Sequence, residues 1–328
     1  MLLTGLTVAP AGAAPAPGGA TTIGPGVQLM TPVGGGAYEQ CTGNFVFRTW
    51  SYTWRRVYYR TSTGATASRL VRVTHPHTYV GMAAHCVGAA TNTDTDTNGC
   101  TSGSMPLGTT VYFYQGVSGG SSIGGLVSLG NGSNGTRIGS GVLRYSSWLA
   151  MKRVHTTDAN ACNYNDLALV EVNAAYLGRV NPTVPFFGGP TKLAGLPGAG
   201  ASIYTVGNSS QRGTEQSTSG TVNSHSVWTD LVTMSSPGVP GDSGSGYVNA
   251  YGQAVGVLST LNCGGLLGTT CNQNGVGSLA QEVAFARSHG LSNLTLVPGT
   301  RAFTASGAGQ TTGTPTSGGG GGLLGGLL

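Results

Sequence analysis

Residues 237–246 read PGVPGDSGSG, with Asp242 directly before Ser243 and a glycine on either side of that pair. A neutral serine hydroxyl is a weak nucleophile. It needs a base to take its proton and backbone N–H groups to stabilise the oxyanion that forms. A glycine before the serine allows a tight turn that points two N–H groups at one position. The stretch therefore predicts a nucleophilic Ser243 in an oxyanion-hole turn, and the rest of the chain should contain its partners.

The composition favours a β-rich protein. The chain has 328 residues, of which 58 are glycine and only 8% are charged. Abundant Gly, Thr, Ser and Val with few long helix formers is typical of an all-β fold with many turns, and the length is enough to bury a sizeable core. The excess of five positive charges is small and scattered along the sequence, so nucleic acid is not expected as a partner.

Short β-like runs follow one another along the chain, with turn signals between them. Their regular spacing favours barrels or a sandwich. The runs lie at 41–50, 68–73, 109–115, 166–172, 201–206, 226–234, 245–249 and 253–261. One helix is predicted at 278–290, where Ser278 can act as the N-cap and Gly290 as the stop.

Changes in composition divide the chain into segments. Residues 1–16 have the features of a truncated signal segment, and residues 17–37 are rich in Pro and Gly. Segment 173–190 carries turn-forming residues and prolines, so it is expected to connect two halves. The predicted domains are therefore 38–180 and 181–300, and the Gly-rich residues 301–328 are expected to form a disordered tail.

The N-terminus and the cysteines both favour export. An apolar stretch leads to Ala11-Gly12-Ala13, the small-x-small pattern at which signal peptidases cut. No CxxC pair with metal-ligand spacing is present, so disulfides are expected and a zinc site is not. No other stretch is long and apolar enough to span a membrane. The six cysteines lie at positions 41, 86, 100, 162, 263 and 271.

His85 is the candidate base and Asp166 the candidate acid that orients it. His85 lies in YVGMAAHCV (79–87), where small residues let its ring approach a second barrel. Asp166 opens DLALVEV (166–172), where a buried strand follows a loop, and Asp158 in a polar loop is the alternative. The other histidines sit among polar residues or beside a proline, at positions 75, 77, 155, 225 and 289.

AAHC, a strand-initiating DLALV and GDSG, in the order His, Asp, Ser, resemble the chymotrypsin/trypsin-like serine peptidases over about residues 38–290. Because the same triad occurs on other folds in other chain orders, the order itself discriminates. The resemblance implies two antiparallel six-stranded β-barrels with one C-terminal helix and an active site between the barrels. It implies His85 as general base, Asp166 as its orienter and Ser243 as nucleophile. The N–H groups of Gly241 and Ser243 would form the oxyanion hole.

The resemblance also implies where substrate and disulfides lie. The run GVLST (256–260) resembles the family's substrate-binding strand, which places Ser259 near Asp166 and Ser259, Thr260 and Leu261 along an extended peptide, where β-strand addition gives main-chain affinity. The implied disulfides are Cys41–Cys86, Cys263–Cys271 and Cys100–Cys162.

Three departures from the family pattern bear on activation and specificity. The chain has no IVGG-like sequence whose new N-terminus could pair with Asp242, so this acid needs a different partner, such as an arginine. Pro237 stands where tryptic members carry an acid, which disfavours substrates with Lys or Arg. Leu261 stands where many relatives have a glycine on the pocket wall, which favours small or medium apolar side chains.

The sequence thus predicts a secreted, monomeric serine endopeptidase that acts on polypeptides without a cofactor or metal. Residues 94–99 open like an EF-hand calcium loop, but Met105 stands where the bidentate Glu should be, so a polar surface loop is the preferred interpretation. A catalytically silent homologue that serves as a binding or adhesion module is the alternative of a different class. An esterase on the same scaffold would share the chemistry and differ in substrate.

Overall fold

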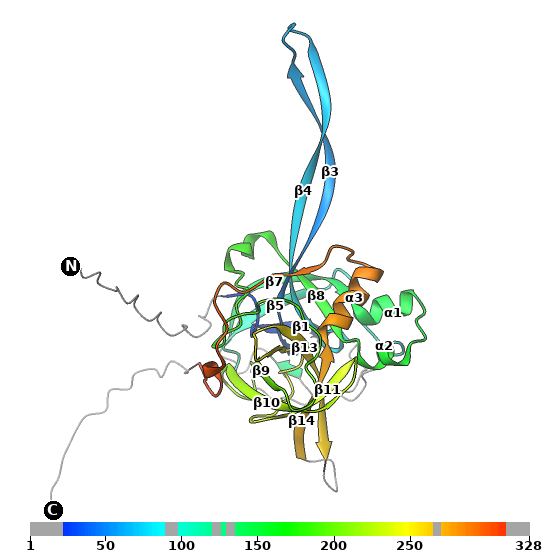
Figure 1. Cartoon of the computed structure of the whole chain (residues 1–328). Coiled ribbons are helices and arrows are strands. Elements are labelled where there is room, and N and C mark those ends of the chain that lie inside the picture. The colour runs from blue at the N-terminus through cyan, green and yellow to red at the C-terminus, as the bar shows by residue number, and fades with distance from the viewer. Residues whose placement is uncertain (1–21, 89–97, 120–125, 129–134, 265–269, 313–328) are drawn as a thin grey trace, which may run out of the picture.

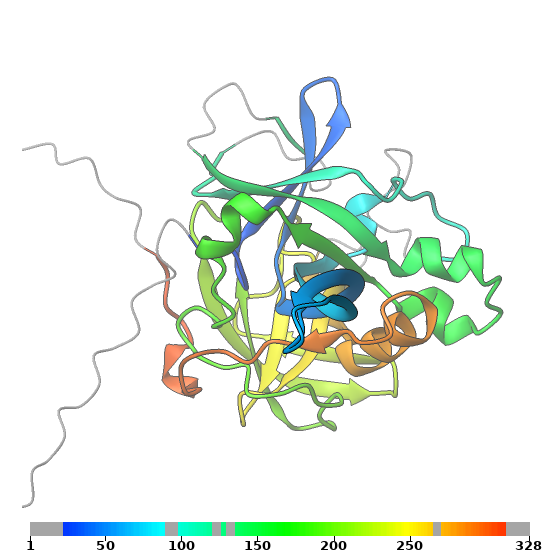
Figure 2. The same ribbon diagram turned by 90° about the horizontal axis from the view of Figure 1, so that it is seen from above.

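The computed structural model describes residues 22–88, 98–119, 126–128, 135–264 and 270–312. Strands dominate this part of the chain, and they form one open sheet and one closed barrel (Figure 1). Figure 2 shows the two assemblies packed on one another, with the open sheet above the barrel strands in that view. The predicted all-β class is confirmed.

The first half forms a nine-stranded sheet in the described residues, in the order β15-β3-β4-β8-β7-β5-β1-β2-β6. All neighbouring strands of this sheet pair antiparallel. An open sheet of nine strands thus stands where a closed six-stranded barrel was expected, and β6 and β15 are its two end strands. The strands are β1 (Gln28–Gly34), β2 (Ala37–Thr42), β3 (Val46–Arg60), β4 (Thr66–Ala83), β5 (Thr110–Gln115), β6 (Leu126–Ser128), β7 (Thr136–Ser146), β8 (Leu167–Val172) and β15 (Thr295–Leu296).

The second half closes into a six-stranded antiparallel barrel, β10-β11-β14-β13-β12-β9, in the described part of the chain. Closure removes free edges, which suits a sequence of short strands and turns. Its apolar core includes Ile203, Val232, Tyr247 and Val255, each fully buried. The strands are β9 (Ser202–Gly207), β10 (Gln216–His225), β11 (Thr229–Met234), β12 (Gly246–Asn249), β13 (Ala254–Gly264) and β14 (Thr270–Ser278).

Three α-helices lie together at one side of the body, as Figure 2 shows for α1 and α2 in green and α3 in orange. The helix α3 (Leu279–His289) begins after Ser278 and ends before Gly290, which confirms the predicted helix. The helices α1 (Ser147–Arg153) and α2 (Ala159–Tyr164) were not predicted, because each is too short to display a helical apolar period. Short 3-10 helices include η1 (His85–Val87), η2 (Ala174–Arg179) and η3 (Ala305–Gly307).

The hairpin of β3 and β4 departs most from the expected architecture. Both strands continue far beyond the sheet, and Figure 1 shows them as a twisted arm that projects from the body. The outward-facing aromatic and apolar residues of these strands resemble core residues in the sequence, so only short strands were predicted here. At its base the arm continues directly into the sheet that carries the candidate site.

Two disulfides join described residues, Cys41–Cys86 and Cys100–Cys162, as the resemblance implied. Cys263 and Cys271 are backbone partners across β13 and β14, and their side chains lie outside the described residues. Most of the candidate calcium loop, at 94–97, also lies outside them. No helix in the described part of the chain is long and apolar enough to cross a membrane.

Candidate active site

His85 and Asp166 lie at the ends of adjacent strands and are hydrogen-bonded to each other. His85 follows β4 by two residues, and Asp166 directly precedes β8, which pairs with β4. The Nδ1 atom of His85 is 2.7 Å from Oδ2 of Asp166, and the His85 backbone N–H donates to Oδ1 at 2.8 Å. A buried carboxylate at this distance accepts the Nδ1 proton, which leaves Nε2 as the nitrogen that can accept another.

A third group binds the same carboxylate from the barrel. The Ser259 hydroxyl donates to Oδ2 of Asp166 at 2.6 Å. The register of β13 against β14 shifts between Leu258 and Thr260, so Ser259 is the extra residue of a β-bulge. Bulges redirect a side chain that the regular pleat would point elsewhere. This contact therefore ties the sheet and the barrel together at the candidate acid.

The turn that carries Ser243 lies against the strand that leads to His85. Thr42 donates its backbone N–H to the Ser243 carbonyl at 2.9 Å. Gly244 has φ +86°, and a Cβ there would lie 2.7 Å from the Thr42 carbonyl oxygen and 2.8 Å from the Ala83 nitrogen. Only glycine fits this approach. The close packing thus places Ser243 beside the chain segment that holds His85.

The geometry of the turn leaves two N–H donors available. Gly241 has φ +95°, and neither its N–H nor that of Ser243 donates a hydrogen bond to any residue in the described ranges. The Ser243 hydroxyl likewise makes no hydrogen bond within those ranges. Two backbone N–H groups and one hydroxyl of this turn are therefore without a hydrogen-bond partner among the described residues.

Arg212 is the partner of Asp242. The Nε atom of Arg212 is 2.8 Å from Oδ2 of Asp242, whose side chain is 2% exposed. The other carboxylate oxygen accepts from the Ser209 N–H at 3.0 Å. The same guanidinium donates to the Ser236 hydroxyl and the Pro237 carbonyl. One arginine thus holds both ends of the segment that leads to Ser243, in place of a cleaved N-terminus.

A small pocket of about 10 Å³ lies next to this segment and is also lined by residues of the barrel strands. Asn274 fixes one of its walls, because its Oδ1 accepts from the Gly238 N–H at 3.0 Å. A Cβ added at Gly238 would be 3.1 Å from Cδ2 of Leu261, so this leucine packs against the segment. The lining includes Arg212, Ser236, Gly238, Asp242, Tyr247 and Asn274.

Glu282, from α3, lies directly behind the candidate acid. Its Oε1 accepts the Asp166 backbone N–H at 3.1 Å, and its Oε2 is buried without a hydrogen-bond partner among the described residues. Burial, and then the nearby Asp166 carboxylate, raise the pKa of Glu282 well above its ordinary value. The carboxyl group is therefore held in its neutral form beyond the pH at which an exposed glutamate ionises.

The raised pKa of Glu282 predicts a pH-dependent stability. The folded protein retains a proton that the unfolded chain releases above about pH 4.5, so the free energy of unfolding should fall as pH rises from there toward the folded-state pKa. Glu282→Gln should show a smaller fall over this window. Urea unfolding at several pH values measures the difference between the variant and the wild type.

Glu171 supplies a matched control of opposite sign. Burial raises its pKa, but hydrogen bonds with His77 and Arg144 outweigh this and lower it below the ordinary value. Its stabilisation is present above the ordinary pKa and is lost as pH falls, so Glu171→Gln should cost more stability at neutral than at acid pH. Equal pH dependence of wild type and Glu282→Gln would contradict the assignment for Glu282.

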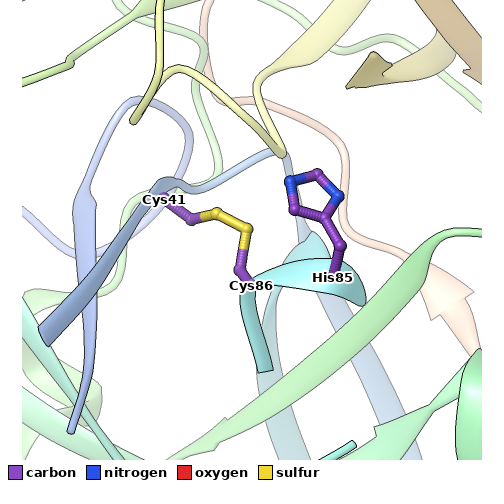
Figure 3. Close-up of side chains that lie close together, drawn as sticks. All are labelled: Cys41, His85 and Cys86. Atoms are coloured by element: carbon purple, nitrogen blue, oxygen red, sulfur yellow. A yellow bond between two sulfur atoms is a disulfide. The ribbon is translucent and has the colours of Figure 1, made fainter. Parts of the chain in front are cut away.

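Figure 3 shows the His85 ring beside the disulfide between Cys41 and Cys86. Their nitrogen and sulfur atoms lie within 4.8 Å of one another. Sulfurs joined in a disulfide are not thiolates and cannot coordinate a metal as thiolates do. The arrangement instead fixes the backbone next to His85, because the bridge ties β2 to η1.

The structure separates the two candidate acids by their contacts. Ser259 contacts Asp166, whereas the alternative acid Asp158 caps α2 by accepting the Asn160 N–H at 2.9 Å. An arginine was expected as a partner of Asp242, but the sequence did not indicate that it is Arg212, and Glu282 was not predicted. Both are charged residues in a chain that has few, and this rarity was the one feature of the sequence that could have marked them as candidates.

A closed six-stranded barrel packed on a second sheet is consistent with the chymotrypsin-like fold of serine peptidases, a class of hydrolases. The chain matches the trypsin-like peptidase domain family over residues 83–257, which is more than half of its length, and it belongs to that family. No curated protein sequence matches the chain.

Three solved structures are similar in fold, at low identity. A glutamic acid specific serine protease that utilizes a histidine triad in substrate binding shares 16% identity, with 84% of this chain and 100% of that chain covered and a TM-score of 0.40. Kallikrein-related peptidase 10 in complex with Zn²⁺ shares 13% identity, with 83% and 97% covered and a TM-score of 0.39. The HtrA-type protease AlgW with a decapeptide shares 10%, with 74% and 63% covered and a TM-score of 0.34.

Proposed function

We propose that the protein is an exported serine endopeptidase that hydrolyses peptide bonds through Ser243, His85 and Asp166. In this mechanism His85 takes the Ser243 proton as the hydroxyl attacks the scissile carbonyl, and Asp166 stabilises the imidazolium. The N–H groups of Gly241 and Ser243 bind the oxyanion. His85 then protonates the leaving amine, and water hydrolyses the acyl-enzyme. The hydrogen bond of 2.7 Å between His85 and Asp166 is the main support.

Substrate is proposed to add as a strand beside Ser259, Thr260 and Leu261. On the side away from β14, β13 pairs with β12 only at Ala254, Gly256 and Val257. Residues 259–261 therefore have no described strand on that side. An extended peptide there would gain main-chain hydrogen bonds. The two disulfides support export, because such bonds persist in oxidising compartments.

The proposed specificity is for small or medium apolar side chains. The Arg212 guanidinium bonds the Pro237 carbonyl, at the place where tryptic members have an acid. Residues 235–240 contain no carboxylate, and Asp242 is already paired with Arg212, so a Lys or Arg side chain would find no partner here. Leu261 narrows the space beside Gly238, so bulky side chains are disfavoured as well.

A fluorophosphonate probe tests the proposed nucleophile. We expect the wild-type chain to be labelled on Ser243 and Ser243→Ala to remain unlabelled. Absence of labelling in the folded wild type, together with no cleavage of a peptide library, would instead support a silent binding module. Labelling with turnover of esters but not of peptides would support an esterase.

Leu261→Gly should widen the specificity. Removing the side chain opens space beside Gly238, so the ratio of kcat/KM for a phenylalanine substrate to that for an alanine substrate should rise, by about 10- to 200-fold. Matched peptides that differ at one residue measure this ratio. Leu177→Ala, at a 44% exposed leucine in η2, is the control and should leave the ratio unchanged. An unchanged ratio in Leu261→Gly would show that Leu261 does not line the specificity pocket.

A further inference from the structure

The arm of β3 and β4 is a two-stranded ribbon that, beyond its base, pairs only with itself among the described strands. β15 pairs with β3 at Phe47 and Arg48, and β8 pairs with β4 only from Tyr79 onward. We call residues 51–76 the ribbon. Its strand portion of ten residues, 51–60, extends about 34 Å. The ribbon is thus a surface of its own, held out from the body (Figure 1).

One face of the ribbon gathers aromatic side chains. Side chains alternate along a strand, and residues paired across the two strands share a face. Tyr52, Trp54 and Tyr58 of β3 therefore lie on the same face as Leu70 and Arg72, the partners of Arg56 and Trp54. Trp54 is 65% exposed, Tyr58 is 68% and Leu70 is 57%. We call this set, with Arg56, the aromatic face.

Positive charge is also concentrated on the ribbon. Residues 51–76 hold five of the chain's 15 lysines and arginines and no carboxylate, so the positive charge is less evenly scattered than expected from the sequence. Arg72 stacks over the Tyr52 ring at 4.5 Å, so charge and aromatic surface are interleaved. The ribbon arginines are Arg55, Arg56, Arg60, Arg69 and Arg72.

Stability of the ribbon does not account for this composition. Arginines on exposed strands hinder edge-to-edge aggregation, and that role is served by either face. Protection against aggregation does not explain why Trp54, Tyr58 and Leu70 are exposed, because contact of these apolar side chains with water is unfavourable. The aromatic face is therefore better explained by a partner.

A second copy of the chain is a poor partner for the arginines. Most described carboxylates are buried or paired, and Asp158 is the only exposed one in the ranges that the structure describes. Two copies would also each carry a net charge of +5. The partner should therefore be an anionic surface of another kind.

The residue types favour a lipid surface. Trp and Tyr lie at headgroup level in membrane interfaces, and arginines next to anionic lipid add about 1 kcal/mol each, which is about fivefold in binding. The disulfides indicate an oxidising compartment, where cell surfaces are accessible. The turn Thr61–Gly64 is polar, so it is not suited to insertion. We propose that the ribbon lies along an anionic bilayer, with its aromatic face in the headgroup layer.

Binding of full-length protein to vesicles tests this proposal. We expect cosedimentation with vesicles containing phosphatidylglycerol, little with phosphatidylcholine alone, and weakening by salt. Trp54→Ser/Tyr58→Ser should reduce partitioning at least about tenfold because it removes apolar area. Arg56→Gln/Arg72→Gln should reduce it about 25-fold, as two arginines are lost.

Matched controls remove the same groups from the body. Tyr251→Ser alters a 78% exposed tyrosine of the barrel, and Lys192→Gln/Arg137→Gln removes two exposed charges. Both should bind vesicles like the wild type. All variants should retain wild-type cleavage of a short soluble peptide without lipid, which shows that they fold.

Four results would overturn the proposal. The proposal is wrong if the wild-type protein does not bind anionic vesicles. It is also wrong if the ribbon variants bind vesicles as tightly as the control variants do. A single-stranded oligonucleotide that binds more tightly than vesicles at equal phosphate concentration would assign the ribbon to nucleic acid. Self-association that depends on Trp54 would assign it to a second copy.

Discussion

Ser243→Ala and His85→Ala should each lower kcat by about 10⁴- to 10⁶-fold, to similar residual rates. The serine and the histidine act as one unit, because the hydroxyl is a poor nucleophile without the base and the base has nothing to activate without the hydroxyl. Single-turnover and steady-state cleavage of a peptide substrate measure both variants. The double variant should be no slower than either single variant.

Control substitutions separate this result from loss of the fold. Ser62→Ala and His75→Ala alter the same residue types on the arm, away from the site, and should leave kcat unchanged. Unfolding curves of the inactive variants should match that of the wild type closely. If either Ser243→Ala or His85→Ala kept most of its activity, the proposed triad would be wrong.

Arg212→Gln should be the most damaging substitution outside the triad. It leaves the Asp242 carboxylate, 2% exposed, without its ion-pair partner. Breaking a buried pair costs about 3–5 kcal/mol. Since the same guanidinium also bonds the Pro237 carbonyl, the oxyanion turn should lose its shape and kcat should fall about 10²- to 10³-fold.

A double substitution distinguishes charge from shape. Arg212→Gln/Asp242→Asn removes both charges and should recover part of the lost stability, because no unpaired buried carboxylate remains. Arg144→Gln is the matched control: its side chain is 52% exposed beside Glu171, so the cost should be under about 1 kcal/mol. Thermal unfolding and peptide cleavage are the readouts. An Arg212→Gln protein as stable and active as Arg144→Gln would show that the pair does not hold the turn.

Sequence alone was sufficient where a function requires a local pattern. GDSG needs its glycines for a tight turn, and Ser278 and Gly290 are residue types that commonly flank a helix, so these features could be located. The resemblance then supplied the pairings Cys41–Cys86 and Cys100–Cys162, because the spacing of the cysteines alone does not distinguish them from other possible pairings.

The features that were missed depend on contacts between distant segments. Arg212 lies 30 residues before Asp242, and nothing local indicates that the two meet inside the barrel. Glu282 lies on a helix that reaches Asp166 only through the packing of α3. The ribbon was missed because Trp54 and Tyr58 have the residue types of a buried strand, and hydrophobic pattern does not reveal that no layer covers them.

The strand β4 has a mechanical consequence. It runs without interruption from the tip of the arm to Ala83, and His85 follows two residues later. A docked arm would therefore set the distance and tilt of the proposed catalytic centre relative to the surface that the arm binds. Cleavage would then be confined to chains that present a scissile bond at that distance, so reach as well as pocket shape would select substrates.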